Sequence, residues 1–421
     1  VQLDQLFETL ELFSPEHNTR IDTEDPTVAE GMKMAWKVFA KPAGVERIRP
    51  LSLIDTQPFI KKNKSAGLTM LHHTKGEAME YSLGRAGQIL AGNKSPNPCL
   101  AGIRSQAKDP ESGKPEDYVG KTRLVWAYPA EMTLIEAKFA VPMYEIFKRK
   151  RTTMMFGRSK MDVGCLIDSA VKNTGDCVYG LDYSKFDSSI PAYLIRYAFK
   201  IIKTWFDLSG EEDVSAWNTI IKYFIHTPIV MPDGNLYTGK KHGVPSGSYF
   251  TQLIDSIVNT VLIGALSCKF NLLVSWRHFF VLGDDVILSS YPGLDLNQVA
   301  NYLKSTFGIV LHPTKCEVYK AHFLGADWPV VTPVRDLQEL VNKAVWPERY
   351  RKYNGVTKTE KVDDAQGVLL SYSKTYYNAW SLILKKSRMA NVFNDGTIAH
   401  WHQGEEDSHL TGYERYKAEM G

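Results

Sequence analysis

The stretch FFVLGDDVILSS constrains the fold more than any other part of this chain. Four apolar residues, a Gly-Asp-Asp and three more apolar residues predict a β-hairpin with strands at Phe279–Leu282 and Val286–Leu288. Gly283 supplies the permissive backbone that a tight turn requires. The hairpin then presents Asp284 and Asp285 at its tip, where two adjacent carboxylates form either an ordinary solvated acidic turn or a site for a divalent cation.

The composition is that of a globular, well-packed protein, with 44% hydrophobic and 11% aromatic residues among 421. That length suffices for two or three core-building units or one large domain. The nearest candidate for a membrane span, Leu253–Leu266, is interrupted by Asp255 and Asn259, and the first residues lack the pattern of a signal peptide. Five scattered cysteines without CxxC spacing favour a reducing compartment. A first residue of Val1 is what a fragment or trimmed chain would have.

The net charge of +3 hides an uneven distribution, because residues 101–160 contain twelve Lys and Arg but only seven Asp and Glu. A basic segment beside a carboxylate tip suits a polyanion that approaches a metal, although a solvated face explains any single lysine. Within this segment, GKTRLVWAYP predicts a strand. Its two-residue period puts Lys121 and Arg123 on one face and Leu124 and Trp126 on the other.

A second predicted strand, CVYGLD, ends on Asp182. It is followed by YSKFDSS and by an amphipathic helix with Pro191 in its first turn. A carboxylate at the end of a strand, with a loop and a helix behind it, is a frequent position for a site residue. Helix capping is the alternative interpretation for Asp187 and, less strongly, for Asp182.

The segment GVPSGSYFTQLIDSIVNTVLIGAL predicts a loop with Ser246 and Gly247, followed by a helix with a continuous apolar face. Thr251, Asp255 and Asn259 are four residues apart and form one polar stripe beside that face. On a half-buried helix these groups need partners. They form either a binding site or an internal hydrogen-bond network that braces the core.

The chain after the hairpin alternates helical and strand patterns. Asn297–Phe307 predicts a helix, and Gly308–Tyr319 predicts a strand-turn-strand unit that carries Lys315. Ala321–Val330 predicts another short strand pair. From Val334 onward the pattern is mostly helical.

In this order, the segments resemble the motifs of viral RNA-dependent RNA polymerases. DYSKFD is similar to the first palm motif, with Asp182 and Asp187 at its acidic positions, SGSYFT to the second and LGDD to the third. Lys315 falls where the lysine of the fourth motif is expected, and FLG at Phe323–Gly325 resembles the fifth, primer-grip motif. Upstream, GKTRLVWA resembles the basic fingers motif that holds triphosphates.

The segment GVPSGSYFTQLIDSIVN is especially similar to the corresponding segment in polymerases of the partitivirus and picobirnavirus group of double-stranded RNA viruses. The motifs span Gly120 to Gly325, about half of the chain. Six motifs in order are highly specific.

The resemblance implies an α+β fold of the right-hand polymerase type, in which a small antiparallel palm sheet packs on helices. It also implies a division of the chain. We expect an N-terminal segment and fingers at 1–175, the palm with its first motif at 176–200, a fingers insertion at 201–241, the remaining palm motifs at 242–331, and a thumb with the C-terminal segment at 332–421.

The implied activity is template-directed RNA synthesis from ribonucleoside triphosphates on an RNA template, as in transcription and replication of a double-stranded RNA genome. A two-metal mechanism would use Mg²⁺, with Mn²⁺ as the alternative, held by Asp182, Asp284 and Asp285. The implied partners are the RNA template, the nascent strand and the nucleotides, without a membrane. A viral capsid protein is a further partner that the resemblance leaves open. The implied location is the virion interior or the host cytoplasm.

The resemblance assigns triphosphate binding to Lys121, Arg123 and Lys114, among which arginine offers bidentate geometry to phosphate oxygens. Lys315 is either a proton donor to the leaving pyrophosphate or a charge on a turn.

The residues expected around the ribose, whose 2′-hydroxyl distinguishes RNA from DNA precursors, are Asp187, Ser246, Thr251, Asp255 and Asn259, and Gly247 is a further expected substrate-binding residue. One departure concerns the second motif. Many positive-strand virus enzymes have asparagine nine residues after the serine, where this chain has Asp255. Because Asn259 lies one helical turn further along the same stripe, the sequence leaves open which of the two contacts the sugar.

Two alternatives share parts of this pattern. A reverse transcriptase has the same carboxylates, but the Ser-Gly loop with Thr251 and the acid at Asp187 favour RNA synthesis. A non-catalytic RNA-binding relative is the other alternative, and the intact Asp182, Asp284 and Asp285 count against it.

Overall fold

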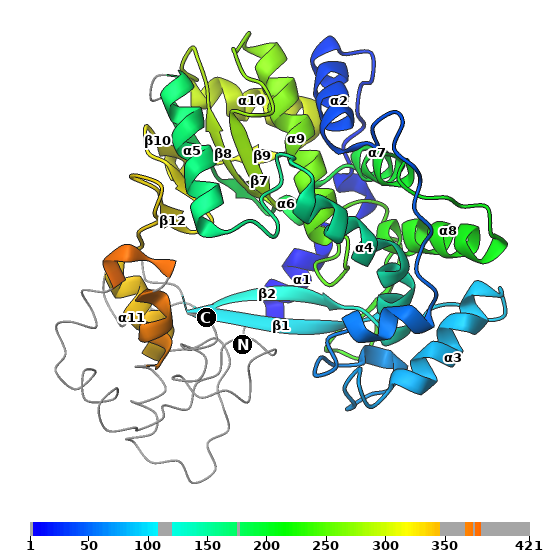
Figure 1. Cartoon of the computed structure of the whole chain (residues 1–421). Coiled ribbons are helices and arrows are strands. Elements are labelled where there is room, and N and C mark those ends of the chain that lie inside the picture. Colours follow the sequence, from blue (N-terminus) through cyan, green and yellow to red (C-terminus); the bar gives the residue numbers. More distant parts are fainter. Residues whose placement is uncertain (1–2, 108–119, 175–176, 346–366, 374, 380–421) are drawn as a thin grey trace. The chain divides into compact units, whose positions relative to one another are not determined.

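A computed structural model of the chain describes residues 3–107, 120–174, 177–345, 367–373 and 375–379 (Figure 1). The chain divides into two compact units. The first comprises Val1–Arg104, Thr122–Arg158 and Ser169–Tyr319, and the second Ser105–Lys121, Ser159–Asp168 and Lys320–Gly421. Apart from Lys114 and Lys121, all of the predicted site residues belong to the first unit.

The first unit is built around helix α9 (Thr251–Lys269), in which every residue of Leu253–Leu266 is buried. The sequence predicted a half-buried helix, which is wrong, because α2 (Pro26–Phe39), α7 (Ala192–Lys203) and a β-sheet together surround it. Among the described residues, α9 is the one helix long and apolar enough to cross a membrane. However, 83% of its apolar window is buried inside the protein, as in the core helix of many globular proteins.

Helices α2 and α9 approach each other at two glycines. A Cβ atom on Gly31 would lie 2.2 Å from the carbonyl oxygen of Val261, and one on Gly264 would lie 2.9 Å from the Cα atom of Gly31. Any side chain at either position would therefore push the two backbones apart. The absence of a Cβ atom at both positions lets α2 cover the face of α9 directly.

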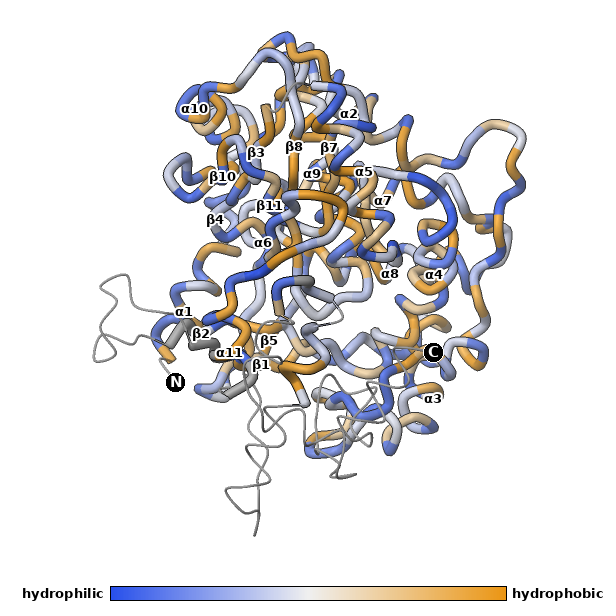
Figure 2. Tube along the Cα trace, turned by 60° about the vertical axis from the view of Figure 1, so that its left-hand side comes forward, coloured by the Kyte–Doolittle hydropathy of each residue, from blue (hydrophilic) through white to orange (hydrophobic). Residues whose placement is uncertain are grey.

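The sheet that packs on α9 has four strands in the order β10–β3–β8–β7, all antiparallel. Its strands are β3 (Val178–Leu181), β7 (Phe279–Leu282), β8 (Asp285–Ser289) and β10 (Glu317–Val318). Figure 2 shows β7, β8 and α9 as hydrophobic segments that lie together, in agreement with their burial. The predicted hairpin is confirmed, and β8 begins at Asp285, one residue earlier than expected. The small antiparallel sheet on helices also agrees with the predicted α+β class.

A second sheet carries the predicted basic strand. Its order is β2–β1–β5–β6, with β1 (Cys99–Ala107), β2 (Gly120–Ala127), β5 (Ile229–Val230) and β6 (Leu236–Tyr237). Leu124 and Trp126 on β2 are buried, whereas Arg123 is exposed. The predicted alternation along this strand is therefore confirmed at these three residues.

Further helices complete the core of the first unit. Phe139 on α4 (Ala130–Arg149) contacts Phe206 and Trp217, with ring centroids 5.0 and 5.1 Å apart. Pro191 precedes α7 as its N-cap, one position before the predicted first turn. The remaining helices of this unit are α1 (Leu3–Glu11), α3 (Met79–Leu90), α6 (Phe186–Ser189), α8 (Glu211–Ile225) and α10 (Leu296–Phe307). Helix α5 (Lys160–Thr174) belongs to both units, because residues 160–168 are part of the second.

The strand-turn-strand prediction for Gly308–Tyr319 is correct in its elements and wrong in their pairing. Strand β9 (Val310–Leu311) pairs with β4 (Tyr183–Ser184), and β10 pairs with β3. The two strands do not pair with each other, because β10 pairs with the strand before Asp182 and β9 pairs with the strand after it. The single helical turn η5 (Pro313–Lys315) connects them.

In the second unit, β11 (His322–Phe323) and β12 (Ala326–Asp327) form the predicted short antiparallel pair. Helix α11 (Leu337–Val345) agrees with the helical pattern expected after Val334. Most of the predicted helical C-terminal region lies outside the described residues.

The glycine contact between α2 and α9 can be tested with two alanine substitutions. Gly31→Ala should lower the free energy of unfolding by about 1–3 kcal/mol, because the new methyl group overlaps the backbone of α9. As a control, Gly87→Ala in α3 places a methyl group with nothing within 4 Å. It should raise stability by about 0.5–1 kcal/mol through helix propensity. Chemical denaturation measures both, and a Gly31→Ala variant as stable as the wild type would contradict the close approach.

Candidate active site

The ladder between β3 and β8 brings distant acids to one end of the sheet. Leu181 pairs with Val286, and Asp182 follows directly, beside the position of Asp285 in the opposite strand. The turn between β7 and β8 carries Asp284, whose side chain is exposed, as is that of Asp182. Asp285 is half-buried. The structure therefore brings the three predicted metal ligands to the same edge.

These acids influence one another. Although the Asp284 side chain is exposed, enough protein surrounds its carboxylate that burial raises the pKa of Asp284 above its ordinary value. The charge of Asp182 raises this pKa further, whereas Arg123 on β2 lowers it. The carboxylate cluster and the basic strand thus lie within electrostatic reach of each other.

Asp187 on α6 and Asp255 on α9 form a carboxyl pair joined by a side-chain hydrogen bond. Asp255 is only 3% exposed, and its Oδ1 atom has no hydrogen-bond partner within the described part of the chain. Burial, with the charge of Asp187 in second place, raises the pKa of Asp255 well above its ordinary value. Burial also raises the pKa of Asp187 to about 6. Two carboxyl groups in hydrogen-bond contact share one proton, so Asp255 is the protonated member at neutral pH.

Asn259, the other candidate for contact with the sugar, uses its side-chain amide for hydrogen bonds within the protein. Its Oδ1 atom accepts a hydrogen bond from the Tyr183 hydroxyl at 3.0 Å. Its Nδ2 atom donates to the carbonyl oxygens of Gly283 at 3.1 Å and Asp284 at 3.3 Å. The side chain is fully buried. The internal-network interpretation of the polar stripe therefore applies at this position.

The Ser-Gly loop lies against strand β2. A Cβ atom on Gly247 would be 1.8 Å from the carbonyl oxygen of Trp126, and the Ser246 hydroxyl accepts a hydrogen bond from the Trp126 amide at 3.2 Å. The Thr251 hydroxyl donates to the Pro245 carbonyl at 2.7 Å and closes the loop on itself.

The same loop is also joined to α6, because the Val244 amide donates to the carbonyl oxygen of Asp187 at 2.7 Å. The predicted loop residues and Asp187 are therefore brought together.

Three residues that contact these elements were missed from the sequence. Glu136 on α4 accepts hydrogen bonds from the Ser248 hydroxyl at 2.5 Å and the Tyr249 amide at 3.1 Å, and burial raises its pKa to about 8. Tyr183 contacts Asn259, and the Ser256 hydroxyl accepts a hydrogen bond from the Gly283 amide at 2.9 Å. A charged residue inside the apolar run TLIEAKFAV was the available signal for Glu136.

The predicted basic residues are only partly described. Arg123 is exposed on β2 and lowers the pKa of both Asp187 and Asp284. Lys121 lies on the same strand, but its side chain is outside the described residues, as is Lys114 altogether.

Lys315 is exposed on η5, just before β10, the strand that pairs with β3. The Asp182 amide donates to Cys316 Sγ at 3.4 Å, and the His312 amide donates to the Asp182 carbonyl at 3.1 Å. Lys315 therefore stands on a turn anchored to the backbone of Asp182.

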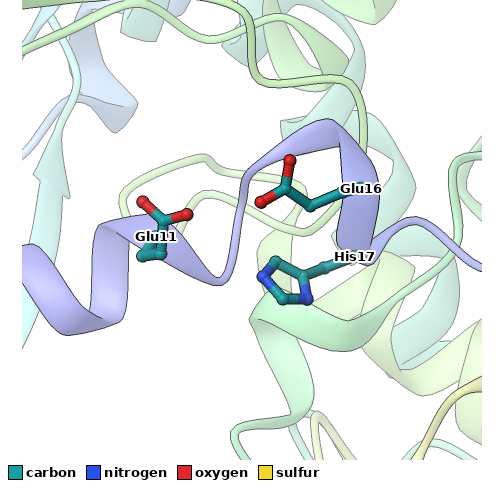
Figure 3. Close-up of side chains that lie close together, drawn as sticks. All are labelled: Glu11, Glu16 and His17. Atoms are coloured by element: carbon teal, nitrogen blue, oxygen red, sulfur yellow. The ribbon is translucent and has the colours of Figure 1, made fainter.

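A different group of ligand atoms lies at the N-terminal end of the chain. Glu11, Glu16 and His17 have atoms within 4.8 Å of one another, and all three side chains are exposed (Figure 3). Within the described residues, the three aspartates at the sheet end are spread more widely than this group. Exposed acidic groups are common without an ion, so this cluster is no argument for a metal.

The donor set at the sheet end fits a hard divalent cation. Carboxylate oxygens are the ligands that Mg²⁺ and Mn²⁺ prefer, and one or two carboxylates with substrate phosphates complete an octahedron. Burial and, to a smaller extent, the charge of Asp182 raise the pKa of Asp284, and a cation between the acids would offset both effects.

Comparison with known proteins identifies the family of the chain. The family model of viral RNA-dependent RNA polymerases matches residues 114–406. An RNA-directed RNA polymerase of Cryptosporidium parvum virus 1 is 32% identical over 199 residues, which cover 46% of this chain and 35% of that protein. A potential RNA-dependent RNA polymerase of human picobirnavirus is 26% identical over 298 residues, 65% of this chain and 50% of that protein. The chain thus spans half or less of the length of these two relatives.

Solved structures show the same fold. The RNA-dependent RNA polymerase of a human picobirnavirus superposes with a TM-score of 0.69 at 18% identity, covering 88% of this chain and 71% of that one. The Sicinivirus 3Dpol polymerase gives a TM-score of 0.65 at 16% identity, covering 95% and 86%. The expected right-hand polymerase fold is therefore confirmed. Because the family model matches more than half of its residues, this chain belongs to the viral RNA-dependent RNA polymerases.

Proposed function

We propose that this chain carries out template-directed RNA synthesis from ribonucleoside triphosphates on an RNA template. The observation that carries the proposal is the convergence of Asp182 with Asp284 and Asp285 at the end of paired strands. In the reaction, the 3′-hydroxyl of the growing strand attacks the α-phosphate of the incoming nucleotide. A new phosphodiester bond forms, and pyrophosphate leaves with the electrons of the broken bond.

Asp182, Asp284 and Asp285 would hold two Mg²⁺ or Mn²⁺ ions. When bound, these ions would lower the pKa of the attacking hydroxyl and neutralise charge on the phosphates. The role of the protein is to keep the three carboxylates at one edge of the sheet, which requires the β3–β8 register and the turn at Gly283.

The basic groups bind the polyanions. Arg123 faces the acidic cluster and offers two parallel hydrogen bonds to phosphate oxygens, with Lys121 and Lys114 as further contacts. Lys315, on the turn beside Asp182, would give its proton to the leaving pyrophosphate. Template binding through backbone phosphates should depend strongly on salt and weakly on sequence.

We assign recognition of the ribose 2′-hydroxyl to the Asp187–Asp255 pair. Asp187 lies within electrostatic reach of Arg123 on β2 and, as the ionised member at neutral pH, can accept a hydrogen bond from a hydroxyl group. Asp255 keeps one buried oxygen without a partner in the described structure. The amide of Asn259 is already engaged. Ser246, Gly247 and Thr251 would shape the loop beneath the sugar.

We further propose the division of the chain given above, with fingers at 1–175 and 201–241, palm at 176–200 and 242–331, and a thumb from 332. The similarity to polymerases of double-stranded RNA viruses supports transcription and replication of such a genome, inside a virion or in the host cytoplasm. A capsid protein is a proposed partner.

The central prediction concerns Asp284. Asp284→Asn should lower ribonucleotide incorporation by about a thousandfold, or about 4 kcal/mol, because a neutral amide no longer holds a cation. Primer extension with labelled ribonucleotides measures the loss, and circular dichroism confirms that the fold is kept. Glu80→Gln neutralises an exposed carboxylate on α3 and should retain full activity. An Asp284→Asn variant that is as active as Glu80→Gln would remove Asp284 from the active site. The same assay with deoxynucleotides and a DNA template separates the polymerase from a reverse transcriptase or a non-catalytic relative.

Ribose selection should depend on Asp187 and not on Asn259. Asp187→Ala should reduce the preference for ribo- over deoxyribonucleotides by about ten- to a hundredfold, the range of one hydrogen bond to a charged group. Asn259→Ala should leave this preference unchanged even if total activity falls. The kcat/KM ratio for the two nucleotides decides the point. A loss of selectivity in Asn259→Ala alone would return the sugar contact to that residue.

The raised pKa of Asp255 predicts how stability changes with pH. The unfolded chain releases this proton at about pH 4, whereas the native state retains it. The free energy of unfolding of the wild type therefore falls as the pH rises above that value, by about 1.4 kcal/mol per pH unit at most. Asp255→Asn removes the titrating group. The variant should therefore be more stable than the wild type by a margin that grows between about pH 5 and about pH 7.

Asp233→Asn is the matched control with the opposite sign. Hydrogen bonds lower the pKa of Asp233, so its substitution should cost relatively more stability as pH rises through the acid range. Chemical denaturation at several pH values measures both variants. A pH-independent difference between Asp255→Asn and the wild type would show that Asp255 is not protonated in the native state.

A further inference from the structure

Asn259 lies where the first, second and third polymerase motifs meet. From helix α9, its amide nitrogen contacts two successive carbonyl oxygens of the Gly-Asp-Asp turn, at Gly283 and Asp284. Its amide oxygen accepts from the hydroxyl of Tyr183, which directly follows Asp182. One turn earlier on the helix, Ser256 accepts the Gly283 amide hydrogen. Hydrogen bonds therefore hold the turn through two of its backbone carbonyl groups and one of its backbone amides.

The chemistry of an asparagine matches this position closely. An amide offers two donor hydrogens and an acceptor oxygen, which here meet two carbonyls and one hydroxyl. Aspartate would set a carboxylate against two carbonyl oxygens, and alanine would leave all three partners without a bond. Because Asn259 is fully buried, water cannot easily replace the lost bonds.

The contacts also have a mechanical consequence. Asp182 follows β3 and Asp284 lies in the turn between β7 and β8, and their like charges repel each other. Nothing in the β3–β8 ladder fixes Asp284 itself, since the last pair of the hairpin is Leu282 with Asp285. The path Asp182–Tyr183–Asn259–Asp284 adds a cross-connection of two hydrogen bonds between the two acids.

We propose that Asn259 is a positioning residue that fixes the separation between Asp182 and Asp284 and thereby sets the affinity of the site for divalent cations. This inference rests on the proposed function and assigns Asn259 a role distinct from sugar recognition. Tyr183 is the second positioning residue, because the hydrogen bond from its hydroxyl to Asn259 connects that residue to the segment that carries Asp182.

The test measures cation binding directly, in the full chain without nucleotide, by electron paramagnetic resonance of Mn²⁺. Asn259→Ala and Tyr183→Phe should each weaken Mn²⁺ binding by about tenfold, the lower end of the range for residues that orient metal ligands. Their effects should be less than additive in the double variant, because both break the same connection. In primer extension, both variants should need more Mg²⁺ and recover when it is raised.

Thr260→Val is the matched control on the same helix. It removes the buried hydrogen bonds of the Thr260 hydroxyl to the Thr153 hydroxyl at 2.8 Å and to the Ser256 carbonyl at 2.9 Å, neither of which involves an atom of the turn. It should lower stability and leave Mn²⁺ affinity unchanged, which separates positioning from a general loosening of α9.

The outcomes distinguish the two proposals. Wild-type Mn²⁺ affinity in Asn259→Ala and in Tyr183→Phe would overturn the positioning role while leaving the polymerase assignment intact. A wild-type chain that neither binds Mn²⁺ nor incorporates ribonucleotides would overturn both. If Asn259→Ala does not fold, Tyr183→Phe decides alone, since it keeps the ring that stacks on Phe186 at 4.9 Å.

Discussion

The antiparallel ladder between β3 and β8 is the interaction on which the rest of the site depends. It joins segments about a hundred residues apart and fixes which residue of one strand faces which residue of the other. A shift of the register by one residue would turn Asp182 to the opposite face of the sheet. The hydrophobic side chains of β3, β7 and β8 resist such a shift, because they would have to leave the core.

Helix α9 packs against one face of this sheet and carries polar side chains that are buried from solvent. Burial of an amide, a carboxyl group and hydroxyls costs free energy unless each finds a partner. Asn259 and Ser256 find partners in the turn, and Asp255 finds one in Asp187. The polar groups therefore act as connectors between elements that the apolar residues only bring close. The contact of Gly31 with α9 shows how tightly the opposite side of the helix is closed.

The sequence was sufficient for the local features and insufficient for the pairings. Hydrophobic periodicity predicted the hairpin, the strand before Asp182 and the existence of α9, because these patterns are encoded in neighbouring residues. The burial of every residue of Leu253–Leu266 on α9 depends on α2, more than two hundred residues earlier, which no local pattern reveals. For the same reason the pairing of β9 with β4 was missed.

The candidate site divides in the same way. The motif order predicted which acids matter, but the choice between Asp255 and Asn259 required their partners. Only the three-dimensional contacts show that Asn259 faces the turn and that Asp255 faces Asp187. The sequence did not predict Glu136, because its partners, Ser248 and Tyr249, lie more than a hundred residues later in the loop before α9.

Asp182 and Asp284 are proposed to bind the same divalent cations. Anomalous diffraction from crystals soaked in Mn²⁺ locates such cations without any assay of activity. We expect a peak in contact with the carboxylates of both aspartates. A peak confined to Glu11, Glu16 and His17, or none at the end of the β3–β8 ladder, would rule out a shared cation.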